Sequence, residues 1–466
     1  MVFTSPVFLG VFLPVLFAVY FLANRAARTY VLLVFSLAFY AWGEPSAVVV
    51  MIALMAVNYI LALVISAAKA RCRLALALLT TGLVADLGAL VAYKYLGFLA
   101  VNVKPLANLC GFDFAVPEIA LPIGISFYVF QILSYLVDVY RGEVKAQRNP
   151  VEFMLYVSLF PQLIAGPIVR YSTIAEDIGN RRADFGNVVA GIRRFILGLA
   201  KKVLIADTMA SIVDVIFDAP AASVPCAYAW LGAVAYTLQI YFDFSGYSDM
   251  AIGLGRMFNF RFLENFDHPY ASVSVQEFWR RWHISLSTWF RDYLYIPLGG
   301  NRKGTGRTYL NLFVVFLLCG FWHGAAWNFI VWGVYHGLGL VVERMGFGRV
   351  LKRFPRWLGN AYLLLFVIVG WVFFRSPDLS YAATYLGDMF GAGTAAFKSF
   401  TPALKFLVLD KFLLLIVGCV AAYPVFDRMV RRVPENVRLA AALAFFAFTY
   451  VLTMTSQYSP FIYFRF

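Results

Sequence analysis

Long apolar runs separated by short polar segments make up most of this chain. Many of the runs approach the roughly 20 residues that a helix needs to cross a hydrocarbon core. The pattern predicts an all-helical, polytopic membrane protein with about 10 to 12 crossings. In order, the runs are Val7–Ala23, Val31–Trp42, Ala47–Ala67, Leu74–Tyr93, Ile119–Val139, Phe153–Val169, Phe195–Phe217, Ala227–Phe242, Leu310–Trp322, Trp327–Val342, Ala361–Phe374, Phe412–Val425 and Leu439–Met454.

Irregular helices are expected among these runs. Val31–Trp42 and Leu310–Trp322 are too short to cross alone, which favours tilted, broken or re-entrant segments. The first run, Val7–Ala23, lacks a basic leader and a small-residue cleavage site, so it is expected to be a retained helix. Basic pairs at Arg181/Arg182, Arg193/Arg194 and Lys201/Lys202 favour a re-entrant pair in that region. Because no repeat or linker divides the chain, residues 1–466 are expected to form one integral domain.

The composition indicates that the protein folds within a lipid membrane. Hydrophobic residues make up 62% of the 466 positions and charged residues 14%, against roughly 25% charged residues in soluble domains. The net charge of +14 comes from short basic loops, which orient membrane proteins and attract anionic headgroups or an anionic cytoplasmic substrate. Placing these loops in the cytoplasm puts the N-terminus outside. No long basic stretch suggests nucleic acid, and five scattered cysteines suggest neither disulfides nor a metal site.

The most informative polar segment runs from Phe278 to Gly304. At helical period, Phe278, Trp282, Leu286, Trp289 and Tyr293 form an aromatic face, and Arg280, His283, Ser287 and Arg291 form a polar stripe. The spacing predicts an interfacial amphipathic helix that ends near Pro297. The turn that follows carries Arg302 and Lys303, whose charges and backbone amides suit phosphate; the alternative is that the arginines only anchor the helix to lipid.

His323 is the strongest candidate for chemistry among the four histidines. It ends an apolar run, where an ionisable side chain is expensive and therefore a functional candidate. Small neighbours at Gly320, Gly324 and Ala325 would leave room for a ligand, and a neutral imidazole can act as a general base. A packed histidine bonded to a carbonyl is an equal alternative. His336 follows 13 positions later, roughly 220° around a helix, so a shared metal face is unsupported.

Two carboxylates lie in the apolar run Tyr241–Gly253. Asp243 and Asp249 need partners at this depth, and the interfacial arginines are the expected ones. A second possibility is that one carboxylate orients the catalytic histidine, which we rank below the ion pair. His268, before a proline in a polar loop, is expected to be structural.

Several motifs together resemble the membrane-bound O-acyltransferase family, and within it the bacterial branch that O-acetylates alginate. The similarity extends from the first helix to the terminal PFIYFRF. The motifs are LPIGISFYVFQILSYLVDVYRGE at 121–143, FPQLIAGPIVRY at 160–171, YFDFSGYSDMAIG at 241–253, WRRWHISLSTWFRDYLYIPLGGNRKG at 279–304 and GFWHGAAWNFIVWGVYHG at 320–337.

The resemblance implies a bundle of about 11 to 12 transmembrane helices, with re-entrant and interfacial helices, around a central tunnel. It implies that His323 is the tunnel histidine and that His283 is a second catalytic position, with Asp243, Asp249, Trp282 and Trp322 in support. Arg280, Arg281, Arg302 and Lys303 would hold the phosphates of acetyl-CoA, the expected donor substrate, with neither a metal nor a bound cofactor.

The resemblance further implies acetyl transfer across the bacterial inner membrane to periplasmic partner proteins that acetylate an exopolysaccharide, with alginate or cellulose as the expected polymer. Alternatives within the family are peptidoglycan O-acetylation and D-alanyl transfer. Outside it, broken helices and embedded carboxylates also suit a transporter of the acyl donor or another solute, and a scaffold for polysaccharide secretion is a third possibility.

Overall fold

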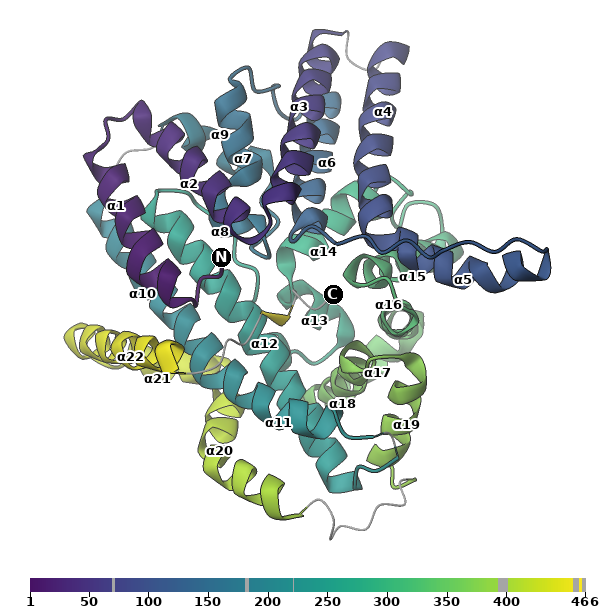
Figure 1. The fold of residues 1–466 in the computed structure, drawn as a ribbon. Helices are drawn as coiled ribbons and strands as arrows, with labels where there is room; N and C mark the ends of the chain where they lie inside the picture. The colour runs from purple at the N-terminus through teal and green to yellow at the C-terminus, as the bar shows by residue number, and fades with distance from the viewer. Residues whose placement is uncertain (69–71, 181–183, 221, 393–400, 456–460, 463–466) are drawn as a thin grey trace. The chain divides into compact units, whose positions relative to one another are not determined.

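The computed structural model describes all residues except 69–71, 181–183, 221, 393–400, 456–460 and 463–466, and the described part is helical without strands. Arg181 and Arg182, Pro460 and the last four residues of the terminal motif therefore lie outside the described residues. The chain divides into two compact units, and Figure 1 labels most of their helices. Unit 1 comprises residues 1–195 and 248–263, and unit 2 comprises residues 196–247 and 264–466. The division concerns packing, so a single integral domain stays a prediction.

Unit 1 is built around α6 (Ile125–Arg141), which is buried along nearly its whole length between α3 and α4. Gly124 starts it with a left-handed φ of 80°, where a Cβ would lie 2.8 Å from the carbonyl oxygen of Leu163. Gly142, with φ 77°, ends it. The helices of this unit are η1 (Phe8–Phe12), α1 (Leu13–Leu22), α2 (Ala27–Gly43), α3 (Pro45–Ala67), α4 (Arg73–Leu90), η2 (Val91–Tyr95), α5 (Leu96–Leu109), α6, α7 (Pro150–Ser158), α8 (Phe160–Leu163), α9 (Tyr171–Asn180) and most of α10 (Phe185–Ala200).

Unit 2 carries the sequence motifs around His283 and His323. Its α15 and α16 form an antiparallel pair, and both α13 and α18 pack against α16 (Figure 1). The helices are η3 (Lys201–Ala206), α11 (Asp207–Phe217), the first part of α12 (Cys226–Met257), η4 (Pro269–Ala271), α13 (Val275–Arg281), α14 (Ile284–Phe290), η5 (Arg291–Tyr295), α15 (Thr305–His323), α16 (Trp327–Val342), η6 (Glu343–Phe347), α17 (Gly348–Leu351), α18 (Arg356–Arg375), α19 (Leu379–Met389), α20 (Thr401–Ala421), α21 (Pro424–Arg431) and α22 (Glu435–Thr455).

Five helices among the described residues are long and apolar enough to cross a membrane: Pro45–Ala67, Arg73–Leu109, Thr305–His323, Arg356–Arg375 and Glu435–Met454. A sixth is possible if Leu409–Ala421 and Pro424–Val430, bent by 95°, count as one span. The helices Phe8–Leu22 and Ala27–Gly43 are apolar but shorter. The polytopic helical architecture is confirmed, whereas the expected number of crossings is higher than the number that this length and composition criterion finds.

Three local predictions are wrong. Leu310–Trp322 is not short or broken, because α15 begins at Thr305 and its polar first turns face inward, with Thr308 and Asn311 buried. Val31–Trp42 belongs to an unbroken helix of 17 residues, α2, so the expected break is wrong there, although α2 remains among the shorter apolar helices. Conversely, Phe153–Val169 is not one span: the helix ends at Ser158 and restarts with Pro161 in the first turn of α8.

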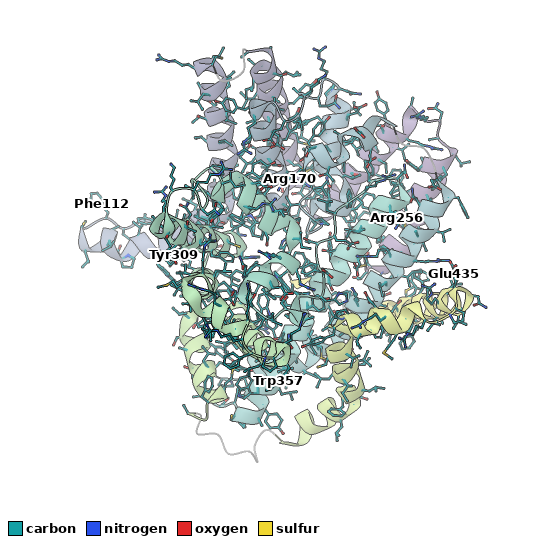
Figure 2. The ribbon with its side chains drawn as sticks, turned by 180° about the vertical axis from the view of Figure 1, so that it is seen from behind. Phe112, Arg170, Arg256, Tyr309, Trp357 and Glu435 are labelled. Carbon is teal, nitrogen blue, oxygen red and sulfur yellow. The ribbon has the colours of Figure 1, made fainter. Side chains whose placement is uncertain are left out.

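Figure 2 shows the side chains of the chain, with Tyr309 on α15 and Trp357 on α18 labelled. Trp357 is 70% exposed at the first turn of α18, whereas Trp371, further along the same helix, is buried. The buried aromatic side chains of α18 therefore lie toward its C-terminal half, which is also where they meet the histidine motif of α15.

Candidate active site

His323 is the last residue of α15 and is buried. Its ring centroid lies 4.9 Å from that of Trp322, 5.0 Å from Trp332 and 5.3 Å from Phe374. Three aromatic rings, from α15, α16 and α18, thus surround the imidazole. The cage of rings leaves the imidazole little contact with solvent.

The small residues beside His323 serve a different purpose from the one expected. A Cβ on Gly320 would lie 2.9 Å from the Cα of Gly333, so these glycines let α15 and α16 approach closely. A Cβ on Gly324 would collide with the ring of Phe329. The expectation that Gly320 and Gly324 leave room for a ligand is therefore wrong: their missing side chains are filled by α16.

His323 and His336 lie on different helices, α15 and α16, so their angular separation around a single helix does not apply. Both imidazoles contact Trp332, at 5.0 and 4.8 Å between ring centroids. His336 Nδ1 accepts a hydrogen bond from Trp279 Nε1 at 3.2 Å. Within the described residues, no group of three histidine, cysteine or acidic side chains is arranged to hold a metal ion. The absence of a metal in the reaction stays a prediction.

His283 does not lie on an interfacial polar stripe. The predicted continuous helix breaks after Arg281: Trp282 is extended and His283 adopts a left-handed conformation, with φ 44° and ψ 55°. The chain then restarts as α14, so the imidazole turns inward and is fully buried. Its ring lies 4.6 Å from Phe244 and 6.3 Å from Trp322. A non-glycine residue in this conformation is strained, and such strain gathers at functional sites.

The environment of His283 keeps it neutral. The residue lies outside the candidate membrane spans, and burial lowers its pKa to about 3. Its Nδ1 lies 3.2 Å from Asn265 Oδ1, and its Nε2 has no hydrogen-bond partner among the described residues. A neutral imidazole with a buried nitrogen that needs a partner is suited to hold a polar group of a substrate.

Trp322 links the two histidines, since both rings approach its indole. Trp282 lies on the same side of the unit, buried against Trp371 at 4.9 Å, and Trp371 stacks on Trp332 at 5.9 Å. The structure thus brings together four of the predicted residues, His283, His323, Trp282 and Trp322, in one aromatic cluster of unit 2.

The two carboxylates are paired with cations, as preferred, but the predicted partners are wrong. Asp243 lies 2.7 Å from Lys202 Nζ, and its other oxygen accepts the backbone N–H of Ile462 at 2.8 Å. Asp249, in unit 1, lies 2.6 Å from Arg194. Both cations, Lys202 and Arg194, come from helical segments that precede α12 in the chain. Among the described residues, no hydrogen bond or ion pair joins Asp243 to His283.

The four predicted phosphate-binding side chains lie on two segments. Arg280 lies in the last turn of α13 and is exposed, and Arg281, which ends the helix, is shared between Glu277 at 2.9 Å and Asp267 at 3.8 Å. Arg302 and Lys303 are exposed in the turn after η5. Arg280, Arg302 and Lys303 have no ion-pair partner in the described part of the chain, so their charges stay available to an anionic ligand.

Sequence reasoning missed Asn265, Lys202 and Trp371. Asn265 lies in a polar loop 18 positions before His283 and carries no motif of its own. Lys202 stands in one of the basic pairs from which a re-entrant segment was expected, and the structure buries its side chain. A lysine among apolar residues, near a run that contains two embedded aspartates, was the available signal for this pair.

The fold and these contacts define a polytopic integral membrane protein with a buried, two-histidine candidate site. The sequence model of the membrane-bound O-acyltransferase family matches residues 140–380. The chain belongs to this family, and it is an O-acyltransferase.

Three relatives show how the similarity is distributed. A probable alginate O-acetylase of Pseudomonas putida is 47% identical over 84% of this chain and 81% of its own. A peptidoglycan O-acetyltransferase of Helicobacter pylori is 37% identical over 84% of this chain and 80% of its own. A teichoic acid D-alanyltransferase of Streptococcus thermophilus is 31% identical over 47% and 56%. Of these three relatives, the alginate O-acetylase has the highest identity to this chain.

Proposed function

We propose that this chain transfers acetyl groups from cytoplasmic acetyl-CoA through the bacterial inner membrane for O-acetylation of an exopolysaccharide, with alginate or cellulose as the polymer. Periplasmic partner proteins would complete the transfer. The similarity to a probable alginate O-acetylase over 84% of the chain supports acetyl as the group and alginate as the first polymer to test. The lower coverage of the D-alanyltransferase favours acetyl over D-alanyl.

The observation that carries the proposal is the pair of buried histidines that both approach Trp322. In this assignment His323, inside its aromatic cage, is the general base that takes the proton of the acceptor hydroxyl. The acceptor oxygen then bonds to the acetyl carbon, the carbon–sulfur bond breaks, and the thiol of CoA leaves with a proton. His283 accepts a hydrogen bond from the substrate, and Trp322 separates and orients the two rings.

In this proposal, exposed basic side chains bind the acetyl donor. Arg280, Arg302 and Lys303 are exposed and carry no ion pair in the described structure, which suits them to bind the phosphates of CoA. Arg281 is already shared with Glu277 and Asp267, so it contributes less free charge. Within the proposal, Arg281 therefore shapes the segment more than it binds the donor.

The test uses the purified protein in nanodiscs with radiolabelled acetyl-CoA, and it follows free CoA and labelled acetate. We expect the wild type to release CoA when an acceptor polymer or the periplasmic partner is supplied, and His323→Ala to release it about 10²- to 10⁴-fold more slowly. A wild type that is inactive with acetyl-CoA but active with a D-alanyl carrier protein would overturn the acetyl assignment. A wild type that is inactive with both donors would overturn acyl transfer by this site.

A further inference from the structure

The chain around Asn265 braces the break that contains His283. The carbonyl oxygen of Asn265 accepts the backbone N–H of Ile284 at 2.9 Å, and the backbone N–H of Asp267 donates to the carbonyl oxygen of Arg281 at 3.0 Å. These two bonds lie on either side of His283 and replace the helical bonds lost between α13 and α14. The left-handed conformation of His283 is thus held from outside its own helix.

The side chain of Asn265 then reaches the imidazole. Its Oδ1 accepts the backbone N–H of Ser285 at 3.1 Å and the Ser285 hydroxyl at 2.9 Å, and it lies 3.2 Å from His283 Nδ1. Because a backbone N–H can only donate, the amide atom that faces it must be the oxygen. An oxygen that faces His283 Nδ1 requires that Nδ1 carry the proton.

Ser285 supports the same assignment. Its single hydroxyl proton is directed to Asn265, and its oxygen lies 3.5 Å from His283 Nδ1, where it can only be a weak second acceptor. If Nδ1 were instead unprotonated, its lone pair would face the Asn265 oxygen with no hydrogen between them. Both neighbours of Nδ1 therefore favour one tautomer.

The proton on Nδ1 leaves Nε2 as the acceptor nitrogen of the ring. Nε2 is buried and has no hydrogen-bond partner among the described residues. The rings nearest to the imidazole belong to Phe244, Phe266 and Trp322, which bring no charge. An acceptor in such surroundings gains most from a neutral O–H or N–H donor, because an unmade buried hydrogen bond costs about 1 to 3 kcal/mol.

We propose that Asn265 is a positioning residue that holds His283 as the Nδ1–H tautomer, so that Nε2 accepts a hydrogen bond from a hydroxyl of the acyl acceptor. The role in transfer rests on the proposed function. Asn265 itself does not touch the substrate: it acts through the imidazole. The assignment divides the work between the histidines, with Nε2 of His283 orienting the hydroxyl and His323 removing its proton.

The test reads the tautomer directly by ¹⁵N NMR of histidine-labelled protein in nanodiscs. The chain has four histidines, and the His283 signals are those that disappear in His283→Gln. Three variants are compared with the wild type. Asn265→Leu keeps the size but removes the acceptor, Asn265→Asp keeps acceptor oxygens, and Ser285→Ala removes one donor to Asn265 while it leaves the acceptor of His283 in place.

We expect a protonated Nδ1 and an unprotonated Nε2 in the wild type, in Asn265→Asp and in Ser285→Ala. Asn265→Leu should lose this preference, and its CoA release should fall at least about 10-fold in kcat. An Nε2–H tautomer in the wild type, or an unchanged tautomer in Asn265→Leu, overturns the assignment. Should Asn265→Leu fail to fold, the wild type and Asn265→Asp still decide the tautomer. A wild type with the expected tautomer but no CoA release overturns the proposed function alone, because the tautomer is read without substrate.

Discussion

The two buried histidines of unit 2 are positioned in different ways. His323 ends a regular helix, and its place follows from the close approach of α15 and α16 at Gly320 and Gly333, with aromatic rings around it. His283 lies in a break, in a left-handed conformation, with a polar brace through Asn265. The aromatic cage excludes solvent from the imidazole of His323, whereas in our proposal the polar contacts of His283 also select which of its nitrogens carries the proton. In our proposal the two environments suit two tasks: His323 removes the proton of the acceptor hydroxyl, and His283 orients that hydroxyl.

The largest expected effect is the loss of polymer acetylation in a His323 variant, compared with a variant of a histidine outside the aromatic cluster. His323→Ala removes the proposed general base, so polymer acetylation in cells should fall about 10²- to 10⁴-fold, while the amount of protein in the membrane stays the same. His268→Ala is the matched control, since His268 contacts Asp267 and Asp427 in a loop. Acetate released from the purified polymer is the measurement. Normal acetate content with His323→Ala would end the catalytic assignment.

A second prediction tests the buried ion pair between Lys202 and Asp243, which lies next to the residue whose ring packs on His283. Asp243 precedes Phe244, whose ring packs on His283, and Lys202 neutralises Asp243 inside the protein. Lys202→Met leaves the buried carboxylate of Asp243 without its cation and should lower the free energy of unfolding by about 3 to 5 kcal/mol. The exposed Lys352→Met should change it by less than about 0.5 kcal/mol. Denaturant unfolding in detergent measures both, and equal effects would show that the Lys202 pair adds nothing.

A third prediction concerns pH. The folded-state pKa of His283, about 3, lies below its ordinary value of 6.5, so the folded protein binds the histidine proton less readily than the unfolded chain. Stability is then full above pH 6.5 and declines as the pH falls toward 3, by about 2 kcal/mol at pH 5. His283→Gln should flatten this decline. Unfolding curves at pH 5 and pH 8 for both proteins provide the measurement, and parallel declines would contradict the burial of a neutral imidazole.

The smallest expected effect has opposite signs at the two positions. In the left-handed conformation of His283, glycine is favoured over alanine, so His283→Gly should be about 1 kcal/mol more stable than His283→Ala. At the helical His323, His323→Gly should be less stable than His323→Ala by about 0.5 to 1 kcal/mol. Midpoint shifts of the four variants measure this difference. The same sign at both positions would remove the contrast between the two backbones.

Much of this could be predicted from the sequence, because periodicity and motif spacing are local. The apolar runs located most helices, and the position of His323 at the end of α15 followed from its run. The break at Trp282 and His283 could not be predicted, since it depends on backbone bonds from Asn265 and Asp267 in a separate loop. The partners of Asp243 and Asp249 were missed for the same reason: Lys202 and Arg194 approach only when distant segments pack.

The most direct test of the central claim is a double-variant comparison of CoA release from labelled acetyl-CoA by the wild type, His323→Ala, His283→Ala and the protein with both changes. If the two histidines act on one acyl transfer from either side of Trp322, the doubly changed protein should be no slower than His323→Ala alone, because the second histidine has nothing left to assist. The account would be contradicted if the rate losses of the two single variants multiplied in the doubly changed protein, or if His283→Ala released CoA at the wild-type rate.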